Sequence, residues 1–138
     1  MKRLTLVRHA KSDWSIAGQP DWERTLNARG LKDAPEMGRR LRERKLKPDV
    51  ILTSPAVRAL TTATLLAKEL GLPAEKLQKD DRLYHASPGA ILEVIRELGG
   101  TSRHVMVVAH NPGLTEFSDQ IASDRRIDHM PTCAVVTV

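Results

Sequence analysis

Three short apolar runs constrain the fold of this chain more than any other feature. They are RLTLV at residues 3–7, VILTS at residues 50–54 and HVMVVAH at residues 104–110. Each has the length of a strand, and none alternates regularly with polar residues. Strands without that alternation are typical of a sheet covered on both faces. We therefore expect a three-layer α/β sandwich with a mainly parallel central sheet and helices on both faces.

The segments between these runs have helical patterns, as that architecture requires. Apolar residues recur at spacings of three and four, which predicts helices at about residues 28–45, 56–70, 88–98 and 114–122. The first helix should place its apolar positions inward: Leu31, Ala34, Met37, Gly38 and Leu41. Pro35 should kink this helix or begin a second one. Residues 77–83 form a weaker strand candidate, and CAVVTV at residues 133–138 predicts a last strand.

Two residues should end or begin helices by local chemistry. Gly71 is placed to terminate the second helix, because glycine readily adopts the left-handed conformation of a C-cap. Ser87 is placed to cap the third helix, whose first turn then holds Pro88. We expect the chain to form one compact domain over residues 1–138, since 41% of them are hydrophobic.

No targeting or membrane segment is apparent in the sequence. The start, MKRLTLVRHA, lacks an apolar stretch of signal-peptide length, and no run is long enough to cross a bilayer. The only cysteine is Cys133, which excludes an internal disulfide and favours a reducing cytoplasm. We expect no membrane association.

The net charge of +5 points toward anionic partners. Much of it comes from RRLRERKLK at residues 39–47, where Glu43 is interleaved. We interpret this block as a solvated helix face rather than a nucleic-acid patch. Aromatic residues make up only 3% of the chain, which leaves little material for base stacking, so we expect no nucleic-acid partner.

Residues with polar side chains stand at the carboxyl ends of the three apolar runs. The first run leads into Arg8 and His9, the second ends in Ser54 and is followed by Pro55 with Arg58 one turn later, and the third ends in His110. In open parallel sheets, ligands bind outside the carboxyl ends of the strands. Two arginines and two histidines at that edge predict a cationic pocket for a phosphoryl group. Helix N-termini near residues 56 and 113 would add N–H donors.

The order and spacing of these motifs resemble those of a known family. LVRHAKS, TLNARG, LTSPAVRALTTA, VVAHNPGL and HMPTC together are similar to the histidine phosphatase superfamily, which has the phosphoglycerate-mutase-like fold. Within it, the short chain resembles the SixA-like phosphohistidine phosphatases. The resemblance implies a covalent phosphohistidine intermediate and no metal or other cofactor.

The resemblance implies a role for each matching residue. His9 would be the nucleophile, Arg8 and Arg58 the clamps on the phosphoryl group, and His110 the second histidine of the pocket. Asn111, beside His110, would contact the substrate.

The resemblance implies one further contact, and the sequence departs from the family pattern at two positions. Arg24, which precedes TLNARG, would touch the phosphoryl group. Ala10 stands where the family more often has glycine, and Thr61 where it often has glutamine.

The chemistry of phosphoryl transfer suits these residue types. A neutral imidazole is a competent nucleophile if an acceptor, commonly a backbone carbonyl, holds its other nitrogen. Arg8 and Arg58 would disfavour a second positive charge and so keep His9 neutral. Arginine forks match the oxygens of the transferring group. His110 would donate to a phosphoryl oxygen, either as an imidazolium or as a neutral N–H.

The sequence leaves the general acid open. Larger relatives use a glutamate after the third strand, and RLYHASP at residues 82–88 holds no match. The candidates are Asp21, His85 and Asp13, in that order. His104 and His129 are interpreted as structural or surface residues, and a zinc site is disfavoured because no Asp, Glu or Cys stands at ligand spacing beside His9 or His110.

Substrate choice rests on the shortness of the chain. No segment between strands is long enough for a capping subdomain, so we expect an open site that suits a phosphohistidine on a protein surface better than a small metabolite. The alternatives are a small-molecule phosphomonoesterase of the same superfamily and a non-catalytic module that binds phosphorylated partners.

Overall fold

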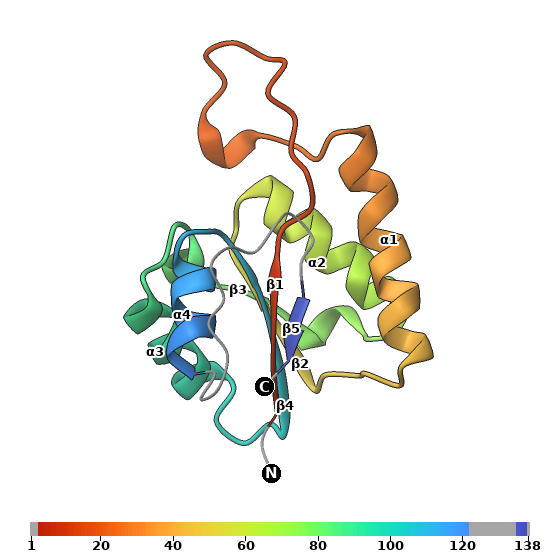
Figure 1. Cartoon of the computed structure of the whole chain (residues 1–138), viewed down its shortest axis with the longest axis vertical. Coiled ribbons are helices and arrows are strands. Elements are labelled where there is room, and N and C mark those ends of the chain that lie inside the picture. Colours follow the sequence, from red (N-terminus) through yellow and green to blue (C-terminus); the bar gives the residue numbers. More distant parts are fainter. Residues whose placement is uncertain (1–2, 122–134, 138) are drawn as a thin grey trace.

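The protein is built on one twisted sheet flanked by helices (Figure 1). The computed structural model describes residues 3–121 and 135–137. The strands are β1 (Arg3–Arg8), β2 (Val50–Thr53), β3 (Leu77–Lys79), β4 (His104–Ala109) and β5 (Val135–Thr137), and they lie in the order β3-β2-β4-β1-β5. The first four are parallel, and β5 pairs antiparallel with β1.

Helices cover both faces of this sheet, which confirms the expected α/β sandwich. Helices α1 (Ala28–Glu43) and α2 (Val57–Leu70) lie on one face, and α3 (Pro88–Leu98) and α4 (Gly113–Ile121) lie on the other (Figure 1). Three short 3-10 helices connect the larger elements: η1 (Asp21–Glu23), η2 (Ala74–Lys76) and η3 (Asp81–Leu83).

Successive residues of the central strands pack into hydrophobic cores on opposite faces of the sheet. In β1, Leu6 packs in the cluster that contains Ile91 of α3, whereas Val7 packs in the cluster that contains Leu66 of α2. All six residues of β4 are buried. Because side chains alternate across a strand, a sheet covered on both faces needs apolar residues at every position, which explains the uninterrupted runs.

Helix α1 corrects two predictions. Pro35 does not begin a second helix, since α1 runs unbroken from Ala28 to Glu43, and Leu31 is 51% exposed rather than buried. The inward position is Gly30 instead, where an added Cβ would collide with the carbonyl oxygen of Lys11. Close packing of α1 against α2 stabilises the helix enough to offset the hydrogen bond that proline removes, a cost of about 3 kcal/mol.

The third strand is shorter than the pattern at residues 77–83 predicts. The side chain of Asp80 accepts a hydrogen bond from the backbone N–H of Arg82 and turns the chain into η3, so pairing stops at Lys79. The expected caps are present: Ser87 accepts from the N–H of Ala90, and Gly71 has a φ of 69°. Of the predicted final strand, the structure describes Val135–Thr137, and Cys133 lies outside the described residues.

Residues 39–43 of the basic block form the expected exposed helix face around the buried Leu41, whereas residues 44–47 lie beyond the end of α1. Arg40 pairs with Glu36 at 3.0 Å, and Arg39 and Arg42 lie 3.9 Å and 3.8 Å from the carboxylate of Glu69. In the described part of the chain, no helix combines the length and the apolar character that crossing a membrane would require.

Candidate active site

Strand order explains why residues far apart in sequence meet. Strands β2, β4 and β1 are neighbours, so the residues that follow them, Ser54, His110 and His9, share one edge of the sheet. The segment between β1 and α1 extends beyond the same edge (Figure 1). Together they form a pocket of about 220 Å³, and the residues that line it are Arg8, His9, Lys11, Ser12, Trp14, Arg24, Arg58, His85, His110 and Asn111.

His9 is held in one orientation by its own backbone. Its Nδ1 lies 2.8 Å from the carbonyl oxygen of Ala10, and a carbonyl only accepts, so Nδ1 carries the hydrogen. Burial lowers the pKa of His9 to about 4, and the charges of Arg58 and Arg8 act in the same direction, while the bond to Ala10 opposes them. At neutral pH, Nε2 therefore has a free lone pair.

The backbone beside His9 is anchored to α2. The N–H of Ala10 donates to Oγ1 of Thr62 over 3.0 Å, and that hydroxyl donates to the carbonyl of Arg58 over 2.7 Å. Ala10 and Thr62 are both fully buried. This chain of hydrogen bonds ties the position of His9 to the helix that carries Arg58.

His110 is neutral and its tautomer follows from its neighbours. Burial is the main reason that the pKa of His110 falls to about 2, and His9 and Arg58 lower it further. Its Nδ1 lies 3.3 Å from Nη2 of Arg58, which only donates, so Nδ1 accepts and Nε2–H donates to Oγ of Ser54 over 2.7 Å. The neutral ring thus directs its N–H to Ser54, and its donation to a phosphoryl oxygen stays a prediction. Its ring centroid lies 5.2 Å from that of His9.

Arg58 is only 1% exposed and has a donor to spare. Its Nη1 donates to the carbonyl of Asp21 and its Nη2 to the carboxylate of Asp21. Its Nε is buried and has no hydrogen-bond partner among the described residues. A buried N–H without an acceptor costs about 1–3 kcal/mol.

Asp21 does not line the pocket, but it is hydrogen-bonded to four residues around it. Its carboxylate accepts hydrogen bonds from Arg24, Arg58, Tyr84 and His85. Burial raises the pKa of Asp21, but these four hydrogen bonds together outweigh it and hold the pKa well below its usual range. A carboxyl group in this state carries no proton at neutral pH, so the geometry argues against the leading candidate for the acid.

Arg24 fastens the segment between β1 and α1 against the pocket. Its side chain donates to Asp21 and, over 2.6 Å, to Oγ of Ser12. Its guanidinium carbon lies 3.5 Å from the centre of the Trp14 ring, a cation–π contact. Arg24 thus lines the pocket with its charge held in place.

The two other acid candidates differ in position. His85 lines the pocket, its ring centroid lies 5.0 Å from that of His110, and its Nε2 lies 2.9 Å from Oδ2 of Asp21. Because an ionised carboxylate only accepts, Nε2 carries a hydrogen, and Nδ1 is the nitrogen available for exchange. Asp13 is instead bound to the N–H and hydroxyl of Ser15 in the exposed part of the loop and does not line the pocket.

Four residues of the neighbourhood carry no assignment in the sequence analysis. Lys11, Ser12 and Trp14 line the pocket, and Tyr84 donates to Asp21 over 2.6 Å. For Trp14 and Tyr84, the sequence signal that could have indicated a role is the rarity of aromatic residues, since the chain has only two Trp, one Tyr and one Phe.

The remaining assigned residues lie as follows. Asn111 lines the pocket and its Oδ1 accepts from the N–H and hydroxyl of Thr115 at the start of α4. His104 lies at the opposite end of β4 and bonds Thr5, and His129 is outside the described residues. In the ranges that the structure describes, no group of three or more His, Cys, Asp or Glu is arranged to hold a metal.

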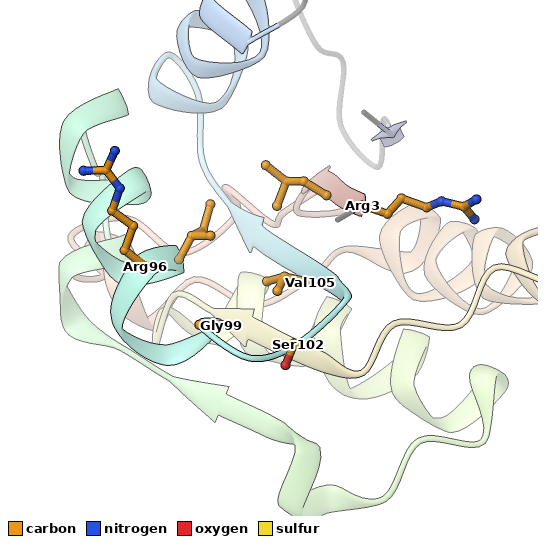
Figure 2. A pocket seen from close by; sticks show the side chains of 8 residues that line it. Arg3, Arg96, Gly99, Ser102 and Val105 are labelled. Carbon is orange, nitrogen blue, oxygen red and sulfur yellow. The ribbon is translucent and has the colours of Figure 1, made fainter. Parts of the chain in front are cut away.

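A cavity of about 390 Å³ lies at the opposite end of the sheet, beside the amino ends of β1 and β4. Figure 2 shows the side chains of Arg3 and Arg96 extending from different sides of it without converging. The rest of its lining is apolar or small. The cavity at the carboxyl edge is smaller but holds all the converging cations and histidines, so it is the candidate active site.

Comparison with known proteins agrees with this geometry. The family model of the histidine phosphatase superfamily (branch 1) matches residues 4–98. The chain belongs to the histidine phosphatase superfamily. This confirms the family resemblance read from the motifs.

Relatives within the superfamily include phosphatases and mutases. An uncharacterised protein of Mycobacterium tuberculosis is 34% identical over 85% of this chain and 70% of its own length. A 2,3-bisphosphoglycerate-dependent phosphoglycerate mutase of Chelativorans is 37% identical, but over 62% of this chain and only 43% of the mutase.

A solved histidine phosphatase structure matches the fold over almost its whole length. An Agrobacterium tumefaciens protein assigned as the phosphohistidine phosphatase SixA superposes with a TM-score of 0.89 and 26% identity. The match covers 99% of this chain and 90% of that one.

Proposed function

We propose that this histidine phosphatase removes the phosphoryl group from phosphohistidine on proteins through a covalent intermediate on His9. One observation carries the proposal: a buried, neutral histidine has its Nδ1 fixed on the carbonyl of Ala10 and faces a pocket lined by three arginines. Binding alone would need the arginines but not an oriented nucleophile.

In the first step, Nε2 of His9 attacks phosphorus. A bond forms between Nε2 and phosphorus while the bond to the leaving imidazole breaks. Arg8 and Arg58 stabilise the charge on the phosphoryl oxygens. His110 lies against Arg58 and contributes its neutral ring to the same cluster.

A proton must reach the leaving group, and His85 is the donor that the geometry supports. Its Nε2–H is engaged by Asp21, so a second hydrogen on the protonated ring sits on Nδ1. Asp21 acts as the group that orients His85, not as the acid. In the second step the neutral His85 takes a proton from water as the water attacks phosphorus, the P–N bond to His9 breaks, and phosphate leaves.

The pocket also carries the positive charge that this chemistry needs. Arg8, Arg24, Arg58 and Lys11 line it, and arginine forks match the phosphoryl oxygens. We therefore propose that turnover needs no metal ion. A cytoplasmic location remains a prediction from the cysteine content.

A protein substrate is favoured over a small metabolite by the shape of the site. A pocket of about 220 Å³ is smaller than the roughly 300–1,000 Å³ typical of sites that enclose a small-molecule ligand. Its surroundings include exposed apolar side chains, with Trp14 at 76%, Ile16 at 59% and Trp22 at 53% exposure. Such side chains suit contact with a protein surface. Similarity to the Agrobacterium SixA protein supports the same substrate class.

A panel of phosphorylated substrates tests the proposal. Purified protein is assayed with a phosphohistidine protein, free phosphohistidine, an aryl phosphate and common sugar phosphates, with His9→Ala as the control. We expect the phosphohistidine protein to have the highest kcat/KM and His9→Ala to abolish turnover. Preference for a sugar phosphate would instead support the small-molecule phosphatase, and binding without turnover would support the non-catalytic module.

A further inference from the structure

A second hollow lies directly beside the phosphate pocket. Its volume is about 350 Å³, and the residues that line it are Trp22, Pro55, Ala56, Asp81 and Tyr84. Three of them are sequence neighbours of site residues, since Trp22 follows Asp21, Pro55 follows Ser54, and Tyr84 precedes His85. The second hollow is therefore built on the same segments that hold the site.

Asp21 connects the linings of the two spaces. Oδ2 of Asp21 accepts a hydrogen bond from Tyr84, which lines the second hollow, and from Arg58 and His85, which line the phosphate pocket. One carboxylate oxygen thus touches residues of both linings. A residue that presents its phosphoryl group to His9 brings its neighbours in the chain to the second hollow.

The lining of the second hollow has a definite chemistry. Two aromatic rings, a proline and an alanine provide apolar surface, and Asp81 provides the charge. Among the described residues, no hydrogen bond or ion pair engages the carboxylate of Asp81. This negative group beside a strongly cationic pocket selects for a positive partner.

Lysine and arginine side chains match that lining best. Their aliphatic stems pack on apolar surface, and their charged ends lie over aromatic rings or beside carboxylates. The molecule already contains one such contact, where Arg24 stacks 3.5 Å from the centre of the Trp14 ring. A purely apolar side chain would leave Asp81 without a partner.

We propose that the second hollow binds a lysine or arginine side chain that flanks the phosphorylated residue of a protein substrate. This inference rests on the proposed function and adds a specificity site to it. Trp22 and Tyr84 hold the stem of that side chain, and Asp81 pairs with its charge.

Phosphohistidine peptides that differ at one flanking residue test the inference. Lysine, norleucine or glutamate is placed on either side of the phosphohistidine, since norleucine keeps the stem of lysine without its charge. For wild-type protein we expect KM to be about 3- to 10-fold lower with lysine than with norleucine in at least one position, and highest with glutamate. Asp81→Asn and Trp22→Ala should remove the preference.

Matched controls separate this inference from the proposed function. Glu75→Gln neutralises an exposed acid outside both pockets and should keep the lysine preference. Phosphoramidate occupies only the phosphate pocket, so Asp81→Asn should hydrolyse it at the wild-type rate. If Trp22→Ala also loses phosphoramidate turnover, that variant has damaged the phosphate pocket, and the inference is then tested by Asp81→Asn alone.

The outcomes are distinct. Equal KM for lysine and norleucine in both positions, or a preference that survives in Asp81→Asn, overturns the inference and leaves the phosphatase intact. Calorimetric binding of the same peptides to His9→Ala protein reports the second hollow without turnover. Lysine preference in that assay supports the inference even if the phosphatase assay fails.

Discussion

Asp21 and Arg58 are joined twice, with Nη2 of Arg58 2.8 Å from Oδ2 of Asp21 and Nη1 2.7 Å from its carbonyl oxygen. Arg58 lies in the first turn of helix α2, whereas Asp21 lies in the segment between β1 and α1. Because Asp21 also binds Arg24, one loop residue holds two arginines of the pocket. The pair therefore fixes both the shape and the charge of the site.

Asp21→Asn should slow all substrates. The substitution removes a charge that positions two arginines, and a charge-assisted hydrogen bond is worth about 1.5–3 kcal/mol, so kcat/KM should fall roughly 10- to 100-fold for aryl phosphates and phosphoramidate. Alkyl phosphates should lose more, because Asp21 also orients His85. Asp13→Asn, in the same loop but bound only to Ser15, should change little. A loss confined to alkyl phosphates would contradict the role of Asp21 in positioning the arginines.

His85→Asn should slow the hydrolysis of alkyl phosphates selectively. General acid catalysis contributes about 100- to 10,000-fold when the leaving group is poor, so hydrolysis of alkyl phosphates should fall within that range. Aryl phosphates, whose leaving groups need less help, should lose less than about 10-fold. Rates measured across a series of leaving groups check this. A uniform loss across the series would remove His85 as the proton donor.

Much of the site could be predicted because topology does most of the positioning. Arg8 ends β1, and His9 and His110 directly follow the parallel strands β1 and β4, whose carboxyl ends meet at one edge of the sheet. The contacts of Asp21 with Tyr84 and His85 could not be predicted, since they join loops 63 and 64 residues apart whose paths no periodicity determines.

The fold shows the same division between pattern and packing. Apolar runs predict the strands, but the choice between Gly30 and Leu31 as the inward residue of α1 depends on how closely the Lys11 carbonyl approaches. That approach is a tertiary contact, and a spacing of three and four fits both residues. Likewise, the hydrogen bond from Arg82 to Asp80 ends β3 where the composition alone suggests that it continues.

His9 should titrate well below an ordinary histidine. Burial and neighbouring arginines lower its pKa to about 4, so it remains neutral and nucleophilic at every pH above that value. NMR titration of histidine Cε1–H signals, assigned with a His9→Asn variant, measures this directly. A midpoint near 6.5 would contradict the buried, cation-flanked environment of the ring.

The same shifts make stability depend on pH in one direction. In the unfolded chain, both His9 and His110 become protonated below about pH 6.5. In the folded protein, His9 becomes protonated only near pH 4 and His110 only near pH 2. Stability is therefore full above the unfolded pKa and falls as the pH drops from 6.5 to 4, by up to about 1.4 kcal/mol per pH unit for each histidine. Urea unfolding at pH 7 and pH 5 checks this, and a His110→Asn variant should show a smaller slope. An unchanged free energy of unfolding would contradict it.

Thr62→Val should reduce activity through the position of His9. The substitution leaves the buried N–H of Ala10 without its acceptor, a cost of about 1–3 kcal/mol, and frees the backbone that orients the ring. We expect a lower kcat with a smaller change in KM. Thr64→Val is the matched control, because Thr64 is exposed and its hydroxyl bonds only to its own helix. Equal effects of both variants would exclude a positioning role for Thr62.

The covalent intermediate on His9 is the central claim, and mass spectrometry of a rapidly alkali-quenched reaction tests it most directly. Because a P–N bond survives alkali and breaks in acid, the phosphoryl group should appear on the peptide that contains His9 after alkali and vanish after acid. His110→Ala should slow its formation and breakdown while the label stays on His9. Label on any other residue, or turnover near the wild-type rate in His9→Ala, would contradict the account.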